Sequence, residues 1–360
     1  MRAAHGWVPR AVWLRAALVV WLPALGALPA DARPDPPARS YYVYVCAESE
    51  DEVALVRYGP RGLEVVRRVA VGRYPAETEG PHGIAVDPDG RHWYVSIAHG
   101  TPFGSVHKYA TGSDAWVGDV TLGMYPATLD IAPATRLLYA ANFDLHGPMA
   151  ASSVSAVEID TMEEIARVET GVMPHGSRLS RDGMRHYSVT MMDGELVELD
   201  ALGFEVNRRL PLGDGVQPTW VTAPARDGVV YVTGNNVASV FEVDLDAWRI
   251  RRTFRTGAGP YNLAVTPDGS TLVATYKSGD AVGFWDLATG VERARVSTTR
   301  TIPHGVVVTP DGAYAFVSVE GVGDDPGTVE VYNIPTAERL GAVDIGKQAS
   351  GIAFWTVRDE

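Results

Sequence analysis

Cysteine is almost absent from this sequence, with only Cys46 in 360 residues. A single cysteine excludes any disulfide within the chain, and Cys46 does not stand where a lipid-anchor cysteine would. No Cys-x-x-Cys-His motif is present, which excludes a covalently attached haem. The Gly-x-Ser-x-Gly, P-loop, dinucleotide-binding and His-Glu-x-x-His motifs are also missing, so no enzyme class that these motifs mark is predicted.

Positive charge is also scarce. The chain has 31 Lys and Arg against 44 Asp and Glu, which gives a formal net charge of -13 at pH 7. An acidic surface repels phosphate backbones, and no run of Lys or Arg is longer than a pair. The sequence therefore argues against nucleic acid as a partner.

One apolar run, residues 16–28, is too short and too interrupted by Pro23 to predict a transmembrane span. Arginines precede it and small residues follow it, so we expect a signal peptide over residues 1–30, with cleavage after Ala30 or Ala32. A Pro-rich linker over residues 31–40 follows. These features predict a secreted or periplasmic protein without a transmembrane anchor after cleavage.

Glycine and proline, by contrast, are plentiful, at 37 and 24 residues, and 46% of the chain is hydrophobic. They recur at fixed positions of a sequence repeat. In order, each repeat contains a Pro-x-Gly-like turn, a short apolar strand, Pro-Asp-Gly, a strand rich in Tyr and Val, a polar loop and a third strand. Its copies lie 42 to 48 residues apart and start at Pro81, Pro126, Pro174, Pro218, Pro260, Pro303 and Ala349. This period, with about four strands per copy, is typical of propeller blades.

The seventh copy ends after one strand, near residues 351–357, whereas the N-terminal part supplies three strands without a partner, near residues 41–47, 53–58 and 63–71. Pairing them completes a blade and leaves no open sheet edge. The sequence thus predicts an all-β fold over residues 41–360: a monomeric seven-bladed β-propeller of four-stranded blades, closed by pairing of the N- and C-terminal strands.

The strand sequences resemble the YVTN-type (YncE-like) seven-bladed propeller repeat. The segments that carry the resemblance are Tyr44-Val45-Cys46-Ala47-Glu48-Ser49, Tyr94-Val95-Ser96, Tyr139-Ala140-Ala141-Asn142 and Tyr231-Val232-Thr233-Gly234-Asn235-Asn236. In fold, that family is similar to bacterial lactonases and streptogramin lyases, among others. The resemblance implies the architecture and no particular activity, because one propeller hosts many functions.

Histidines recur at one position of the repeat. The residue after the repeat proline is, around the ring, His82, Ala127, His175, Thr219, Tyr261, His304 and Ser350. In a propeller these residues meet at the mouth of the central channel, where three evenly spread imidazoles could form an open metal site. His99 and His146 fall in loops expected on the same face. The alternative is that each imidazole hydrogen-bonds a neighbouring loop while glycine supplies the turn.

Two carboxylates, Glu48 and Glu320, align just after the Tyr-Val strand and, with Tyr261, are further candidates at the mouth. They could complete a metal shell or act as a general base, or they could simply be solvated. Imidazole suits copper, zinc or iron alike, so the identity of a transition metal stays open.

Three interpretations of function remain open. The first is a secreted or periplasmic binding propeller whose histidine-rich, metal-binding face holds a metal ion, a small molecule or a protein. The second is a metal-dependent oxidoreductase or lyase that uses the same face. The third is a protein-interaction scaffold without metal.

Overall fold

The computed structural model of the protein describes residues 36–74, 76–100, 102–224 and 228–359. The expected signal peptide and residues 31–35 of the expected linker lie outside these residues. Within them, no helix has the length and apolar character needed to cross a membrane.

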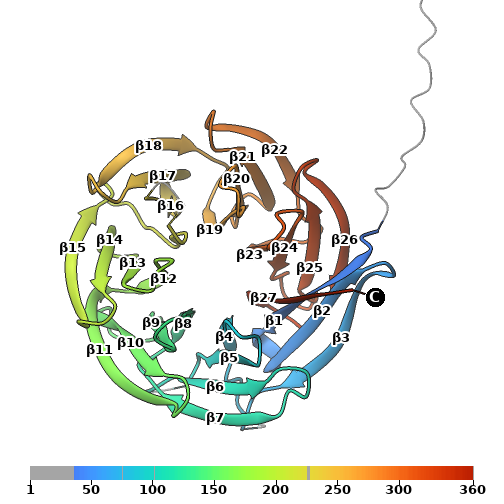
Figure 1. Ribbon diagram of the computed structural model, residues 1–360, viewed down its shortest axis with the longest axis horizontal. Coiled ribbons are helices and arrows are strands. Elements are labelled where there is room, and N and C mark those ends of the chain that lie inside the picture. The colour runs from blue at the N-terminus through green and yellow to red at the C-terminus, as the bar shows by residue number, and fades with distance from the viewer. Residues whose placement is uncertain (1–35, 75, 101, 225–227, 360) are drawn as a thin grey trace, which may run out of the picture. The chain divides into compact units, whose positions relative to one another are not determined.

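Seven antiparallel sheets surround a common axis and form a seven-bladed β-propeller, as expected (Figure 1). The closing blade combines both ends of the described chain, in the order β27 (Ala349–Asp359), β1 (Arg39–Ala47), β2 (Glu52–Gly59) and β3 (Gly62–Ala70). Tyr41 pairs with Val357 and Ala47 with Ala349, so β27 is the innermost strand of a blade that the N-terminal strands complete. This confirms the predicted closure.

The other blades follow in chain order, and each of them except the β16–β18 blade begins with its innermost strand. Their strands are β4 (Pro81–Val86), β5 (His92–Ile97), β6 (Ser105–Ala110) and β7 (Trp116–Thr121); β8 (Pro126–Ala132), β9 (Leu137–Asn142), β10 (Ala151–Glu158) and β11 (Glu163–Val172); β12 (Pro174–Leu179), β13 (Arg185–Thr190), β14 (Glu195–Asp200) and β15 (Glu205–Pro211); β16 (Val229–Gly234), β17 (Ser239–Asp244) and β18 (Arg249–Arg255); β19 (Pro260–Val265), β20 (Thr271–Tyr276), β21 (Ala281–Asp286) and β22 (Val291–Ser297); β23 (Pro303–Val308), β24 (Tyr314–Val319), β25 (Thr328–Asn333) and β26 (Glu338–Asp344). Two short 3-10 turns, η1 (Glu48–Glu50) and η2 (Asn235–Val237), follow β1 and β16.

One blade, β16–β18, has three regular strands rather than four. Its innermost segment is held by an isolated bridge between Val221 and Val232. In the β4 blade the hairpin is closed by a bond from the backbone N–H of Asp87 to the carbonyl of His92, at 3.0 Å. Pro224 stands at the equivalent position and has no N–H to donate, so the ladder ends early.

The core lies between blades. Outer strands such as β15 alternate exposed and half-buried residues, whereas β9 is buried along its whole length. The ring of Tyr44, in the closing blade, stacks on that of Trp93, in the next blade, with centroids 5.0 Å apart. Trp93, Trp220 and Trp285 are buried and Trp355 is half-buried, so tryptophans contribute to the packing between blades.

The Pro-x-Gly segments are not turns, which corrects the expectation from sequence. They are the first residues of β4, β12 and β23. A Cβ added to Gly83 would lie 2.5 Å from the carbonyl oxygen of Ala127, in the next innermost strand. Glycine is needed there because neighbouring strands approach closely around the axis, and the positive φ expected of a tight turn is found instead in the Pro-Asp-Gly hairpins, for example 69° at Gly90.

Candidate functional site at the channel mouth

The three predicted histidines come together at one end of the channel. His82, His175 and His304 are the second residues of β4, β12 and β23, and all three side chains line a cavity of about 540 Å³. Here this is called the mouth cavity. Its other ionisable or phenolic residues are Glu48, Tyr125, Tyr261, Lys277 and Glu320.

The start of each innermost strand is locally irregular, and this aims the histidines at the axis. The pairing of β4 with β5 shifts register between Pro81 and Ile84. There the N–H of Gly83 bonds the Ser96 hydroxyl oxygen at 2.7 Å instead of a strand carbonyl. A bulge of this kind re-aims a side chain, which explains why His82 leaves the sheet and enters the mouth cavity.

Glu48, the first residue of η1, organises one side of the cavity. It is 2% exposed, and its carboxylate contacts His82 Nδ1 at 2.8 Å, His99 Nε2 at 2.7 Å and the hydroxyl of Tyr125 at 3.0 Å. Burial acts to raise the pKa of Glu48, but the interactions with His82 and His99 outweigh it and hold that pKa well below its usual value. Glu48 is therefore an ionised acceptor at neutral pH.

His99 and His146 lie on the same face as the other three histidines and form an outer pair. His99 Nδ1 is 3.1 Å from His146 Nε2, and His99 reaches the mouth cavity through its bond to Glu48. The structure thus links both loop histidines to Glu48 and His82 rather than to the channel axis.

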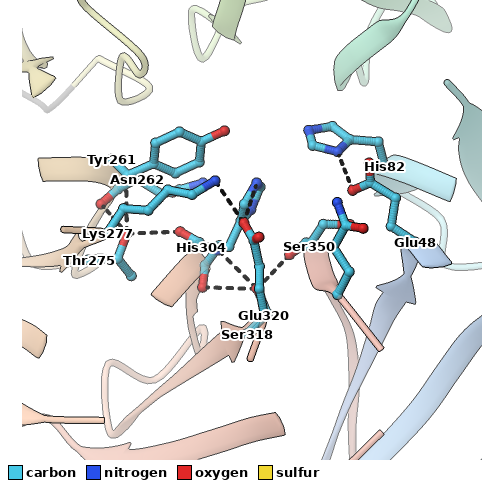
Figure 2. Close-up of polar contacts among 12 residues, drawn as sticks. Glu48, His82, Tyr261, Asn262, Thr275, Lys277, His304, Ser318, Glu320 and Ser350 are labelled. Atoms are coloured by element: carbon cyan, nitrogen blue, oxygen red, sulfur yellow. Dashed lines mark hydrogen bonds and ion pairs between the residues drawn. The ribbon is translucent and has the colours of Figure 1, made fainter. Parts of the chain in front are cut away.

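The proton positions of two imidazoles follow from their partners. His175 Nδ1 is 2.8 Å from the carbonyl of Thr219, which can only accept, so Nδ1 carries the hydrogen and Nε2 accepts from the Tyr261 hydroxyl at 3.1 Å. His82 Nδ1 likewise donates to Glu48, and its Nε2 has no hydrogen-bond partner among the described residues. Figure 2 shows this second nitrogen pointing away from Glu48, toward the side on which Tyr261 lies.

The opposite side of the cavity carries an ion pair that sequence reasoning missed. Lys277 Nζ lies 2.7 Å from a carboxylate oxygen of Glu320 and 4.3 Å from the ring centroid of Tyr261 (Figure 2). Burial lowers the pKa of Lys277, but Tyr261 and Glu320 outweigh it, and the pKa is raised. Burial raises the pKa of Tyr261 to about 12. At neutral pH the lysine is charged and the phenol is protonated.

Two buried imidazoles of the cavity, His175 and His304, stay neutral at pH 7. Burial, with a smaller contribution from His82, lowers the pKa of His175 to about 3. Burial and then the charge of Lys277 hold the pKa of His304 well below its usual value. Neutral imidazole is the form that binds metals and accepts protons.

The spacing of the three rings bears on the predicted metal site. The ring centroids of His82 and His304 are 5.2 Å apart, and those of His82 and His175 are 6.2 Å apart. Two imidazoles on one tetrahedral ion have centroids roughly 5 Å apart, given metal–nitrogen distances of about 2.0–2.1 Å. The first pair fits this spacing and the second is wider. Across the described part of the chain, no three His, Cys, Asp or Glu side chains are already grouped to hold a metal ion.

A second ring of residues lines the cavity, and the sequence contained a signal for it. The residue directly after the second strand of each blade is, in order, Glu48, Ala98, Phe143, Met191, Asn235, Lys277 and Glu320. All of them except Ala98 line the mouth cavity. A comparison of this position between the repeats, like the comparison of the residue after the proline, would have identified Lys277. Tyr125, in contrast, precedes a repeat proline and has a left-handed φ of 52°.

Comparison with known proteins gives the fold and one relative. No family model matches the chain. Virginiamycin B lyase of Nocardia farcinica (strain IFM 10152) is 27% identical over 241 residues, which cover 65% of this chain and 76% of the lyase. The periplasmic gluconolactonase of Pseudomonas aeruginosa superposes with a TM-score of 0.72 at 18% identity, over 88% of this chain and 99% of that one. A proposed 6-phosphogluconolactonase of Bacteroides fragilis NCTC 9343 gives a TM-score of 0.70 at 13% identity, over 87% and 98%. The chain is a seven-bladed propeller whose structural neighbours include lactonase-like proteins and whose sequence is similar to a lyase.

Proposed function

We propose that the mouth cavity binds a small organic molecule and moves a proton on it, as an enzyme of the lyase type does. The observation that carries this proposal is the Glu48–His82 pair, a buried carboxylate bonded at 2.8 Å to an imidazole whose other nitrogen faces the cavity. A channel that needed only to be packed would place apolar side chains there, because a buried carboxylate is costly to desolvate.

This pair has the properties of a general base. Glu48 is ionised and holds His82 through Nδ1, so the imidazole presents Nε2 to a bound molecule. A carboxylate behind an imidazole fixes its tautomer and stabilises the imidazolium that forms when a proton is taken. His82 is thus the residue that abstracts the proton.

Lys277 would supply the complementary charge. Elimination places negative charge on the departing group or on the carbonyl next to the proton that is removed. A lysine that stays protonated in the same cavity stabilises that charge, as oxyanion-binding groups do. The similarity to virginiamycin B lyase supports this class of reaction.

The test is turnover of virginiamycin B, gluconolactone and 6-phosphogluconolactone by the purified protein, followed by mass spectrometry. Elimination leaves the total mass of the products equal to that of the substrate, whereas hydrolysis adds one water. We expect His82→Gln to lower the rate of elimination by about a hundredfold or more. His92→Gln is the matched control, since His92 bonds Asp87 at a Pro-Asp-Gly hairpin, at the opposite end of β4 from His82. Elimination that persists in His82→Gln would refute the assignment.

A second candidate function is the binding of a transition metal by His82, His175 and His304. Two of these imidazoles have Nδ1 bonded to an acceptor, Glu48 or the carbonyl of Thr219, which is how metal-binding histidines are usually held. The three nitrogen donors fit copper, zinc or iron, provided that the rings close in on one another. His99 and His146 would then stand outside the ligands, behind Glu48.

Metal analysis of the purified protein and titration with Zn²⁺ and Cu²⁺ test this candidate. The parent should bind one equivalent, and the triple variant His82→Ala, His175→Ala, His304→Ala should not. Equal binding by both proteins would exclude the site. If removal of the metal by a chelator abolishes elimination, the reaction depends on the bound metal. If elimination persists, the reaction does not need the metal.

Export to the periplasm or the medium is part of the proposal. It is supported by the arginines and the apolar run of residues 1–30. Cell fractionation of the full chain and of a chain lacking residues 2–30 tests it, since only the full chain should leave the cytoplasm.

A further inference from the structure

The channel leads from the mouth cavity to a second cavity on the opposite face of the propeller. A narrow space of about 30 Å³ lies below the three histidines and is bounded farther along by Arg178 and Val306. The same two residues line a cavity of about 900 Å³ on the face that carries the Pro-Asp-Gly turn of Pro267 to Gly269. Here this is called the exit cavity.

Arg178, on β12, is at the junction between the channel and the exit cavity. Its guanidinium lies over the ring of Trp220, 4.4 Å from the centroid, and donates from Nη1 to the carbonyl of Ser177 at 2.7 Å. Within the described part of the chain, no carboxylate lies within ion-pair distance of it. Asp130 acts on Arg178 electrostatically but accepts the backbone N–H groups of Ile131 and Leu179 at 3.0 and 2.8 Å.

The positive charge of Arg178 is only partly compensated by the groups around it, and this lowers the stability of its charged form. Burial lowers the pKa of Arg178 and raises the pKa of Asp130, so both groups are poorly solvated where they stand. A cation held in this way gains from an anion that reaches it through the cavity.

The acidic residues of the exit cavity are already engaged. Glu242 pairs with Arg251 and Arg252, at 3.2 and 2.5 Å. Asp268 and Asp286 accept hydrogen bonds from hydroxyl groups of their own turns. Arg178 and the exposed Arg181 both line the cavity and have no ion-pair partner in the described residues.

Polar and apolar residues both line the exit cavity. Its apolar part includes Leu263, Val265, Val306 and Phe354. A guanidinium binds a carboxylate through two parallel hydrogen bonds, and a cavity of this volume is in the range that takes a small organic molecule. The net charge of the chain, -13, penalises a dianion more than a monoanion.

We propose that the exit cavity is a binding site for an amphipathic monocarboxylate, with the carboxylate on Arg178 and the apolar body against Leu263, Val306 and Phe354. This site is separate from the mouth cavity and does not depend on the function proposed for it. Its ligand chemistry follows from Arg178, a cation without an ion-pair partner in the described residues, and from the apolar residues that line the same cavity.

Isothermal titration calorimetry with octanoate, and with octan-1-ol as the uncharged counterpart, tests the proposal on the full chain. We expect octanoate to bind the parent at least about tenfold more tightly than octanol, since one charge-assisted pair is lost in the alcohol. Arg178→Gln should weaken octanoate binding by about tenfold or more and leave octanol unchanged. Arg255→Gln, which removes an exposed arginine of β18 outside the cavity lining, is the matched control and should bind as the parent does.

A second variant keeps the test decisive if Arg178→Gln does not fold. Ala288 is exposed and lines the exit cavity, so Ala288→Glu adds a carboxylate without disturbing the core. It should weaken octanoate binding and spare octanol binding. Absence of octanoate binding to the parent, equal affinity for octanol, or binding that neither variant weakens would overturn the proposal.

Discussion

Glu48→Gln measures what the buried carboxylate contributes to the fold. One carboxylate oxygen of Glu48 accepts from His99 and Tyr125, and the other accepts from His82. A glutamine has one accepting oxygen, so the variant loses at least one of these bonds and weakens the others by removing the charge. A hydrogen bond to a charged group contributes roughly 1.5–3 kcal/mol, and His99 is partly open to water, so we expect a loss of about 2 kcal/mol at pH 7.

The sign of the pH dependence follows from the lowered pKa of Glu48. A carboxylate whose pKa is lower in the folded protein stabilises the fold above its unfolded pKa, near 4.5, and this stabilisation is lost as pH falls toward the folded pKa. The gap between parent and variant should therefore be full at pH 7 and shrink below about pH 4.5. His175 and His304 also make both proteins less stable in acid, because the unfolded histidines take up protons first. Glu48 is not among the causes of the lowered pKa of His175 and has only a lesser influence on that of His304, so most of this loss is common to both proteins.

Urea unfolding followed by tryptophan fluorescence at pH 7 and in steps down to pH 3 provides the measurement. Glu50→Gln is the matched control, since Glu50 is an exposed residue of the same 3-10 turn and should cost little. Equal stability of parent and Glu48→Gln at pH 7, or a gap that stays constant down to pH 3, would refute an ionised Glu48 that accepts three bonds.

Three further predictions address the fold and the electrostatics of the mouth. A chain that ends at Ala349 lacks all of β27 except its first residue and leaves β1 with an unpaired edge, so it should aggregate. A soluble monomer with one cooperative unfolding transition, seen by light scattering and calorimetry, would contradict the closure. Gly83→Ala should lower the free energy of unfolding by about 2 kcal/mol because its Cβ would press on the carbonyl oxygen of Ala127, and urea titration would detect this; no change would mean that the strands can separate. Lys277→Met removes a positive charge that lowers the pKa of His304, so that pKa should rise, which an NMR titration of the imidazole can follow. An unchanged pKa would show that the charge of Lys277 does not contribute to the shift.

The architecture could be predicted because a propeller is a repeat. Each copy brings a Pro-Asp-Gly hairpin and alternating strands, and the missing strands at one end of the chain matched the extra strands at the other. The same periodicity put His82, His175 and His304 at equivalent ring positions, so their meeting at the mouth followed from the fold. The irregular β16 blade also had a local sequence cause, the absent N–H of Pro224.

The contacts between individual side chains could not be predicted from the sequence repeat. Glu48 and Tyr125 are 77 residues apart, and Tyr261 and His175 are 86 apart, so their bonds depend on how blades distant in sequence approach the axis. The role of glycine after the histidines was likewise misread as a turn, because the close approach of neighbouring innermost strands exists only in the assembled ring. Sequence by itself determined the blades and the ring position of each histidine, since both follow from local periodicity. Only the tertiary structure decided that Glu48 is ionised, that Lys277 faces the same cavity and that Arg178 has no ion-pair partner in the described chain, because these depend on burial and on distances between blades.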